Sequence, residues 1–263
     1  LNEVLARRLI DRTRVARLLD AFRDRPAVDS DAIIDVLLRV SELVCELPNI
    51  TGLDINPLFA GPKGVVAVDA RITVARAPAR DKPYDHMAIH PYPAHLVSRQ
   101  HLQDGTPLTI RPIRSEDAQS EAAFVKGLSD EAKRLRFMGA LNELSPEMLV
   151  QFTQIDYRRE MALVAIVEGP SGPKQVGVAR YSINPDRTSC EFAIVVSDDI
   201  QNQGLGTRLM KALMEAARDH GLTRIEGTVL KKNAPMLTLM TELGFAVRPI
   251  PDDPDLVAID RWL

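Results

Sequence analysis

The sequence predicts an α/β fold, with a mixed sheet, that is divided between two parts of the chain. Residues 1–78 contain two stretches with apolar residues at helical intervals, followed by two short apolar runs typical of strands. Residues 79–105 show no sustained periodicity and are rich in proline and histidine. Residues 106–263 alternate between strand-like and helix-like patterns. We therefore expect two domains, joined by a linker at residues 79–105.

The first part is expected to place two helices before a β-hairpin. Apolar residues recur at helical spacing over residues 5–19 and again over residues 29–47. The strand-like runs 52–60 and 64–74 are separated by the sequence Gly-Pro-Lys-Gly, which is typical of a turn between paired strands. This part therefore predicts an α-then-β unit.

The composition is that of an ordinary globular protein and gives no sign of a nucleic-acid or membrane partner. Of the 263 residues, 45% are hydrophobic and 26% are charged, and the formal net charge is −3. No apolar run approaches the roughly 18 residues that a membrane span needs. Cys45 and Cys190 are too few for a disulfide framework, which favours a cytoplasmic location. Because the chain starts at Leu1 inside a helical pattern, we expect it to be a fragment of a longer protein.

The second part predicts the element order β-ααα-β-β-β-α-β-α-β, which corresponds to a mixed sheet with helices on both faces. Helices are expected near residues 115–127, 130–137, 145–153, 205–220 and 233–243. Strands are expected near residues 108–113, 161–168, 174–183, 189–196, 224–230 and 256–263.

A glycine-spaced turn, QNQGLGTRLM at residues 201–210, joins the strand at residues 189–196 to a long amphipathic helix. A dinucleotide-binding fingerprint would need glycine instead of Leu209, and a P-loop would need lysine instead of Thr207. A plain strand-to-helix turn is one reading that remains. The other is a helix N-terminus whose free N–H groups, from about Gln203 onward, bind a phosphate or pyrophosphate.

Three motifs in this part resemble those of the GNAT acetyltransferases. The loop QNQGLG (residues 201–206) matches the family's Q/R-x-x-G-x-G/A loop, which holds the pyrophosphate of acetyl-CoA. TIRPIRSEDA (109–118) is similar to the family's opening strand and helix. NAPMLTLMTELGF (233–245) is similar to the helix that closes the cofactor cleft. The resemblance implies a GNAT acyltransferase fold for residues 106–263 and acetyl-CoA as the co-substrate.

The same resemblance implies a set of cofactor-binding residues. In this family, main-chain groups of the strand before the loop pair with the pantetheine amides and polarise the thioester carbonyl. Here those groups belong to Val195 and Val196, where we expect a bulge that opens the ladder. Asn233 would bond the pantetheine arm, cap its helix, or do both. The implied cofactor-binding residues are Val195, Val196, Gln201, Gln203, Gly204, Leu205, Gly206, Thr207 and Asn233.

The first part resembles the end of the ATP-grasp domain of NDP-forming acyl-CoA synthetases, through LDINPL (53–58) and VVAVDARI (65–72). An ATP-grasp tail joined to a GNAT domain resembles the bacterial Pat-type protein lysine acetyltransferases. In the synthetases, oxygens such as those of Asp54, Asn56 and Asp69 hold Mg²⁺ against nucleotide phosphates. Because the resemblance also implies that several hundred N-terminal residues are absent, we expect no functional metal site here.

Transfer of an acetyl group to a lysine needs a base, because the ε-ammonium has a pKa of about 10.4. Reaching the neutral amine near pH 7 costs about 4.6 kcal/mol, so we expect a carboxylate beside the cleft to take the proton. Glu191 opens the strand that leads to the loop and is the first candidate for this catalytic role. Glu226, at a similar place on the next strand, is the second. Either could instead be a solvated carboxylate at a strand end.

One residue departs from the family pattern. Many GNAT enzymes carry a tyrosine on the helix that closes the cleft, as a general acid for the leaving thiolate. The spacing from Asn233 and Gly244 places Met240 at that position. A methionine cannot donate this proton, so water or another donor is expected to supply it.

The leading hypothesis is an acetyl-CoA-dependent Nε-lysine acetyltransferase that acts on proteins, without a nucleic-acid or membrane partner. By resemblance, its targets are metabolic enzymes such as acyl- and acetyl-CoA synthetases. Two alternatives stay open. One is a small-molecule amine N-acetyltransferase, and the other is a non-catalytic regulatory module that senses acetyl-CoA and signals through the first part of the chain.

Overall fold

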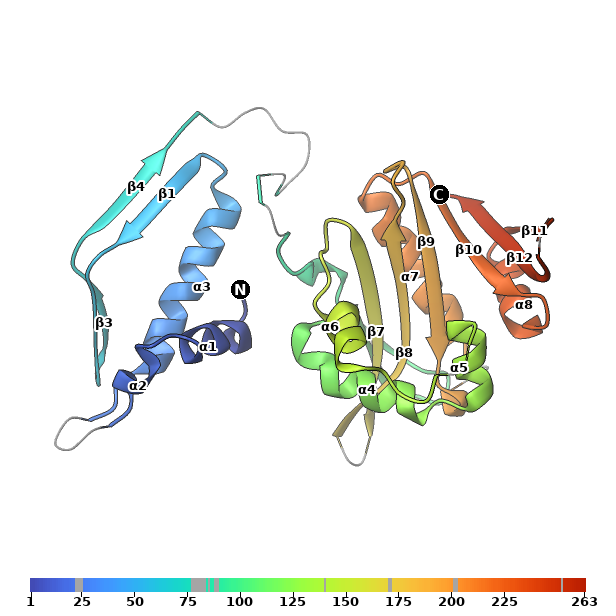
Figure 1. The fold of residues 1–263 in the computed structure, drawn as a ribbon, viewed down its shortest axis with the longest axis horizontal. Helices are drawn as coiled ribbons and strands as arrows, with labels where there is room; N and C mark the ends of the chain where they lie inside the picture. Colours follow the sequence, from blue (N-terminus) through green and yellow to red (C-terminus); the bar gives the residue numbers. More distant parts are fainter. Residues whose placement is uncertain are drawn as a thin grey trace. The chain divides into compact units, whose positions relative to one another are not determined.

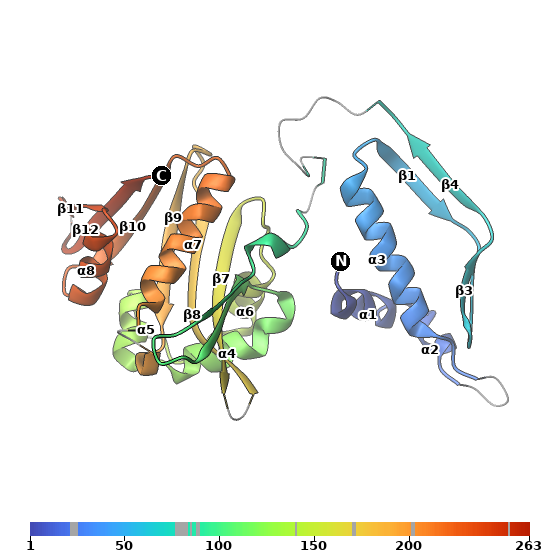
Figure 2. The ribbon, with the colours of Figure 1, turned by 180° about the vertical axis from the view of Figure 1, so that it is seen from behind.

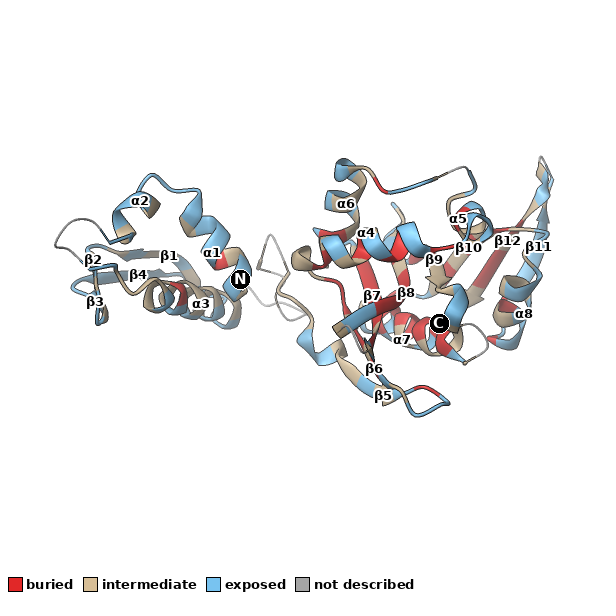
Figure 3. Ribbon diagram, turned by 90° about the horizontal axis from the view of Figure 1, so that it is seen from below, coloured by how far each residue is buried: buried red, intermediate tan, exposed pale blue. Residues whose placement is uncertain are grey.

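The structure, a computed structural model, describes residues 1–21, 26–76, 84, 86–87, 90–139, 141–169, 172–200, 203–251 and 253–263. The chain divides into two compact units, Leu1–Pro91 and Tyr92–Leu263 (Figure 1). Among the described residues, no helix is both long enough and apolar enough to span a membrane. Most of the buried residues belong to the second unit, as the burial colours of Figure 3 show.

The first unit places helices before strands, in the predicted order. Its helices are α1 (Glu3–Asp11), α2 (Ala16–Leu19) and α3 (Ser30–Glu46), and its strands are β1 (Ile50–Ile55), β2 (Leu58–Gly61), β3 (Gly64–Ala67) and β4 (Ala70–Val74). β1 pairs with β4, and β2 pairs with β3, both in antiparallel fashion. Each of the two predicted strands is therefore divided into two shorter ones. Pro57 lies at one division and has no N–H to give to a ladder.

An eight-stranded sheet forms the centre of the second unit, with the order β11-β12-β10-β9-β8-β7-β6-β5. Neighbouring strands are antiparallel except β9 and β10, which are parallel. The predicted mixed sheet is confirmed. Its strands are β5 (Ser98–His101), β6 (Pro107–Pro112), β7 (Glu160–Gly169), β8 (Gly172–Ile183), β9 (Ser189–Val196), β10 (Arg224–Leu230), β11 (Ala246–Ile250) and β12 (Asp253–Trp262).

Helices cover both faces of this sheet. α4, α5 and α6 lie on one face and α7 lies on the other (Figures 1 and 2). Each layer has its own cluster of buried apolar residues against the sheet. The α7 cluster includes Leu205, Leu209 and Leu213, which form the stripe that the helical periodicity predicts. The helices are α4 (Ala118–Gly127), α5 (Asp130–Phe137), α6 (Pro146–Thr153), α7 (Leu205–Asp219) and α8 (Ala234–Glu242), with short 3₁₀ turns at Ala94–Leu96, Ser115–Asp117 and Asp198–Ile200.

Two strands of the sheet have no counterpart in the sequence prediction. β5 lies inside the predicted linker of residues 79–105 and pairs with β6 along its whole length. Its four residues are all polar, so no apolar alternation marks them. β11 is an edge strand whose residues are mostly exposed. β5 lacks apolar residues, and the apolar residues of β11 do not alternate with polar ones, so neither strand shows the pattern of a half-buried strand.

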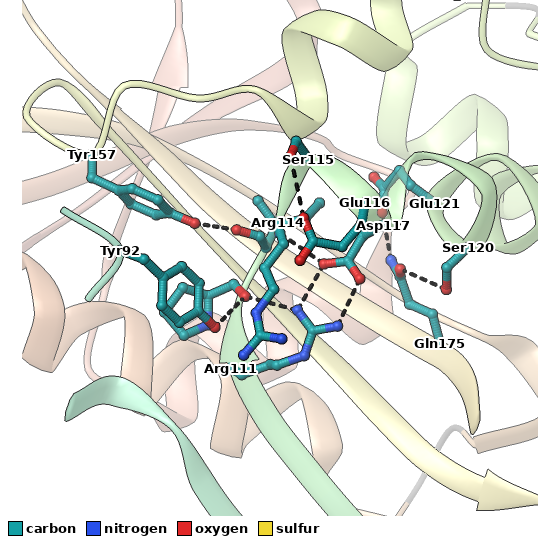
Figure 4. A network of polar contacts seen from close by, with 12 residues as sticks. Tyr92, Arg111, Arg114, Ser115, Glu116, Asp117, Ser120, Glu121, Tyr157 and Gln175 are labelled. Carbon is teal, nitrogen blue, oxygen red and sulfur yellow. Dashed lines mark hydrogen bonds and ion pairs between the residues drawn. The ribbon is translucent and has the colours of Figure 1, made fainter. Parts of the chain in front are cut away.

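A buried arginine–aspartate pair fixes the start of the first helical layer of this unit (Figure 4). The Nη1 and Nη2 groups of Arg111 donate to the two carboxylate oxygens of Asp117 at 2.7 and 2.6 Å. Asp117 also accepts the main-chain N–H of Arg114 at 2.7 Å. Such bidentate, charge-assisted pairs are short and specific in geometry. The carboxylate of Asp117 thus reaches back to the main chain of the turn that precedes α4.

Candidate active site

The parallel pair β9–β10 opens into a cleft. The two strands pair over three residues each, and their ladder ends at Glu191 and Glu226. Beyond these residues, β9 stays with β8 as far as Val196, and β10 stays with β12 as far as Leu230. The strands therefore diverge, and the space between them belongs to a cleft of about 1020 Å³.

This cleft brings together most of the residues that the sequence predicts for a cofactor site. Its walls come from β9, β10, α5 and the first turns of α7 and α8. Gln203 is not among its lining residues, and Gln201 lies outside the described residues. The predicted residues that do line it are Glu191, Val195, Val196, Gly204, Leu205, Gly206, Thr207 and Asn233.

The N-terminus of α7 lines the cleft and can accept an anion. Gly204 precedes the helix with a φ of 73°, a left-handed conformation that favours glycine, and no side chain caps the helix. The N–H of Arg208 bonds to the carbonyl of Gly204 at 3.2 Å. The N–H groups of Leu205, Gly206 and Thr207 therefore have no acceptor inside the helix. These donors and the helix dipole together favour a phosphate group.

Gly206 lies where α7 meets α8. A Cβ built on this glycine would lie 3.1 Å from Cδ2 of Leu239, which is closer than an ordinary van der Waals contact. The missing side chain thus lets the two helices approach each other. It also leaves the first turn of α7 open to a ligand that needs main-chain N–H donors.

Glu191 and Glu226 are neighbours in the parallel ladder, but their surroundings differ. Glu191 lines the cleft, is exposed, and makes no hydrogen bond or ion pair with another described residue. Glu226 accepts a hydrogen bond from Asn184 Nδ2 at 2.8 Å and pairs with Nη2 of Arg224 at 3.2 Å. It does not line the cleft. Glu191 can therefore take up a proton without breaking a contact, whereas Glu226 is part of a polar network.

Comparison with known proteins identifies the family of this chain. Residues 130–245 match the model of the acetyltransferase (GNAT) family, and residues 1–74 match that of the ATP-grasp domain. The chain is 37% identical to the acetyltransferase PA5475 of Pseudomonas aeruginosa over 152 residues, which cover 58% of this chain and 82% of that protein. The chain belongs to the GNAT acetyltransferase family. It is an acetyltransferase, and its co-substrate is acetyl-CoA, as the motifs predict.

Two further relatives are Pat acetyltransferases. The chain is 28% identical to the acetyltransferase Pat of Mycolicibacterium smegmatis over 135 residues, which cover 51% of this chain and only 40% of Pat. The crystal structure of the GNAT domain of S. lividans PAT matches with a TM-score of 0.60 and 26% identity, covering 66% of this chain and 100% of that domain. With an ATP-grasp-like region before its GNAT domain, the chain confirms the resemblance to Pat-type enzymes.

The GNAT cleft opens by divergence of two strands and not by a bulge. The sequence predicts a bulge in β9 at Val195 and Val196. The ladder between β8 and β9, however, runs without a register shift from Cys190 to Val196. The opening arises because β9 and β10 each stay with their outer neighbour. Main-chain groups of β9 beyond Glu191 therefore have no ladder partner on the β10 side, and a ligand with amide groups can pair with them.

α8 forms another wall of the GNAT cleft. Asn233 lines the cleft and accepts the N–H of Met236 on its Oδ1 at 3.2 Å, so it caps the helix from a position inside the site. Met240, which the spacing places where many GNAT enzymes have a tyrosine, is fully buried in the core and does not line the cleft. The residues of α8 that line the cleft include Met236 and Leu239. Among the described lining residues, none is a tyrosine.

A smaller pocket, of about 230 Å³, adjoins the cleft and shares residues 191–193 with it. Its other walls come from α6, β7 and β8. Burial raises the pKa of Glu160 and lowers the pKa of Arg180, both of which line this pocket. The sequence does not single out either residue, because neither belongs to a motif. Only their registers on β7 and β8 bring them next to Glu191.

A buried carboxylate on α4 contacts Arg180, which lines the smaller pocket. Glu121 lies 3.5 Å from Nη2 of Arg180. It also accepts a hydrogen bond from Nε2 of Gln175 (Figure 4). Burial raises the pKa of Glu121. Burial and the nearby charge of Arg180 lower the pKa of Arg136, which lines the larger cleft, to about 10. Arg136 therefore keeps its positive charge near pH 7.

The three residues that the resemblance to ATP-grasp synthetases associates with Mg²⁺ lie in the first unit. Asp54, Asn56 and Asp69 are all exposed, and the carboxylate of Asp69 lies 3.3 Å from Nε of Arg71. This guanidinium places a positive charge next to the carboxylate that a cation would need. Within the described part of the chain, no group of three histidine, cysteine, aspartate or glutamate side chains is arranged to hold a metal ion.

Proposed function

We propose that the protein is an Nε-lysine acetyltransferase that uses acetyl-CoA and acts on proteins in the cytoplasm. Its proposed targets, by resemblance to Pat-type enzymes, are metabolic enzymes such as acyl- and acetyl-CoA synthetases. The observation that best supports this proposal is the junction at Glu191, where the cleft beside the α7 N-terminus meets a second pocket. Because the chain spans only 40% of the length of Pat, the activity of any longer protein is part of the proposal.

The proposal assigns roles to the residues that line the cleft. The N–H groups of residues 203–207 bind the diphosphate of acetyl-CoA, as an uncapped helix N-terminus allows. Main-chain groups of Val195 and Val196 pair with the amides of the pantetheine arm. Asn233 uses Oδ1 to cap α8, which leaves its Nδ2 group to donate to the same arm. Bound acetyl-CoA supplies a thioester, whose carbonyl carbon is the electrophile.

Glu191 is the proposed general base. Its carboxylate takes a proton from the lysine ammonium, directly or through one water molecule. The neutral nitrogen then forms a bond to the acetyl carbonyl carbon. As the bond between carbon and sulfur breaks, the nitrogen gives its second proton to water and becomes the amide nitrogen. Water supplies a proton to the leaving thiolate, since the described lining of the cleft offers no tyrosine for this step. The products are an acetylated lysine and free CoA.

Acetyl transfer by the purified chain tests this function, with release of free CoA thiol as the readout. We expect thiol release that depends on a protein acceptor, with the acetyl group found on lysine Nε by mass spectrometry. The control is the same acceptor after reductive methylation of its lysines, which removes the primary amines and should abolish release. Turnover only with free polyamines or other small amines would contradict the proposal, and so would acetyl-CoA binding without transfer to any acceptor.

A further inference from the structure

A row of polar side chains crosses the sheet at the level where the cleft and the smaller pocket meet. Glu160 on β7 lies opposite Ser182 on β8, and Ser182 lies opposite Glu191 on β9. Glu191 is in turn paired with Glu226 on β10, and Glu226 with Asp260 on β12. Residues directly opposite each other on neighbouring strands point to the same face of a sheet. Four carboxylates of this row therefore share one face.

Arginines offset only part of this negative charge. Asp260 pairs with Arg224 and Arg248 at 3.4 and 3.3 Å, and Glu226 pairs with Arg224 at 3.2 Å. The carboxylates on β7 and β9, by contrast, make no ion pair with a described residue. These are the two carboxylates of the row that line the smaller pocket.

Arg180 also lines the pocket, and its charge is shared between carboxylates. Its Nη2 group lies 3.5 Å from the buried carboxylate of Glu121, and its charge also acts on Glu160. Its guanidinium carbon lies over the Phe152 ring, 4.2 Å from the ring centre, in a cation–π contact. The single positive charge of Arg180 therefore offsets only part of the negative charge of Glu121, Glu160 and Glu191.

We propose that Glu160 determines acceptor specificity by binding a second positive charge, carried by the acceptor protein close to its target lysine. This inference rests on the proposed function, in which the target lysine reaches Glu191. An amine that enters through the smaller pocket meets Glu191 at the wall that the pocket shares with the cleft. Glu160 then lies beside the entering chain and is positioned to bind a neighbouring basic side chain.

The spacing of the strands indicates where that second charge lies. Neighbouring strands are about 4.8 Å apart, so Glu160 and Glu191, separated by two ladders, have main chains about 10 Å apart. In an extended peptide, side chains two residues apart point the same way and are about 7 Å apart at the main chain. The long side chains of lysine and arginine bridge the difference. An arginine or lysine two positions from the target lysine therefore fits the pair of carboxylates.

The donors of Arg180 favour a peptide over a polyamine as the acceptor. Only its Nη2 group has described acceptors, namely Glu121 and the carbonyl of Phe152 at 3.4 Å, while its Nε group is buried without one. A peptide brings carbonyl oxygens that can accept from a guanidinium. A protonated polyamine brings donors only, and it cannot satisfy this side of the pocket.

Steady-state kinetics with paired peptides test the proposal on the full chain. Each peptide has one lysine, and the residue two positions away is arginine in one, glutamine in the second and glutamate in the third. For the unaltered protein we expect kcat/KM to be about tenfold higher with arginine than with glutamine, the effect of one partly desolvated charge pair. Glu160→Gln should remove this preference mainly through KM, and Glu160→Lys should shift it toward the glutamate peptide. Glu168→Gln, an exposed acid at the other end of β7, is the matched control and should keep the original preference.

Each outcome of this experiment decides the question. A preference that disappears in Glu160→Gln and reverses in Glu160→Lys supports the proposal. Equal kcat/KM for all peptides with the unaltered protein overturns it, and so does a preference that survives in Glu160→Gln. Faster transfer to spermidine than to any peptide would overturn both this inference and the proposed function. If transfer to peptide lysines is equally fast whatever the charge of the second residue, the inference about Glu160 is overturned and the proposed function is not.

Discussion

At the scale of single residues, Glu191 lies at the end of the paired part of β9, on a wall of the cleft and on the edge of the smaller pocket. We propose that this carboxylate takes the proton of an amine in the smaller pocket, next to a thioester bound in the cleft. Glu226 lies directly opposite Glu191 in the ladder, but its carboxylate contacts Asn184 and Arg224. The two carboxylates therefore differ in chemistry because their hydrogen-bond partners differ.

Replacing this carboxylate separates catalysis from binding. Glu191→Gln keeps the shape of the side chain but cannot take up the lysine proton, so we expect kcat to fall by about 10²- to 10⁴-fold. The dissociation constant of acetyl-CoA, measured by calorimetry, should stay nearly unchanged. Glu226→Gln is the matched control and should leave kcat close to that of the unaltered protein. An unchanged kcat in Glu191→Gln would show that another group removes the proton.

The residues of the site differ in how far the sequence predicts them. Glu191 is predictable because it precedes the glycine-spaced loop on the same strand, so the local chain sets its place. A residue count from Asn233 identifies Met240 by its place in the motif, but it does not tell which side of α8 meets the cleft. Glu160 and Arg180 meet Glu191 only through the register of three strands, and one sequence does not determine that register.

At the scale of elements, α7 has two structural roles. Its apolar stripe packs into the core against one face of the sheet, while its first turn leaves main-chain N–H donors in the cleft. The two roles meet in the first turn, where Leu205 is buried in the core while Gly206 and Thr207 line the cleft. Substitutions at Gly206 or Thr207, unlike those at Leu205, should therefore change ligand binding with little effect on folding.

Two substitutions at Gly206 test the first turn of α7. Gly206→Ala adds a Cβ that Leu239 can accommodate by moving a few tenths of an ångström, so we expect only a small rise in the dissociation constant of acetyl-CoA. Gly206→Asp adds a negative charge beside the proposed diphosphate site and should weaken binding by a further factor of about ten or more. The difference between the two variants should shrink at high salt, because ions screen exposed charges. Calorimetry at two salt concentrations measures it, and equal affinities for both variants would contradict an anion site here.

The helices and strands also differ in how far the sequence predicts them. α7 is predictable because its apolar residues repeat at helical spacing and its buried face follows that repeat. β5 and β11 are not predictable, because neither buries an apolar face that would give an alternating pattern. Ladder hydrogen bonds to neighbouring strands hold them in place. β5 has further support from Arg208 of α7, whose Nη1 group donates to Oε1 of Gln100 at 3.3 Å. Contacts of this kind join segments more than a hundred residues apart in sequence.

At the scale of the whole molecule, the chain consists of two compact units, and the second contains the entire described cleft. The sequence predicts a GNAT domain at residues 106–263, after a linker. We propose that the domain begins instead at Tyr92. Three features support the earlier start: the hydroxyl of Tyr92 donates to the carbonyl of Pro112 at 3.0 Å, β5 completes one edge of the sheet, and Leu102 is only 4% exposed.

Two truncated chains test this boundary. A chain of residues 92–263 should fold and bind acetyl-CoA with the affinity of the full chain. A chain of residues 106–263 loses β5 and the buried Leu102, and the leucine alone contributes about 1.5–3 kcal/mol to the free energy of unfolding. We therefore expect a clearly lower melting temperature for the shorter chain, measured by circular dichroism. Equal melting temperatures would place the boundary nearer to residue 106.

The divergence of β9 and β10 also gives the second unit a seam. On one side are the strands from β5 to β9 with α7, and on the other are β10, β11 and β12 with α8. Three residue pairs form the described ladder between these halves of the sheet, and the main-chain N–H of Thr223 also donates to the carbonyl of Thr188 at 2.8 Å just before the two strands. A coenzyme bound in the opening would contact both halves of the sheet. Because it binds only the folded protein, it would raise the free energy of unfolding and reduce the motion of one half relative to the other.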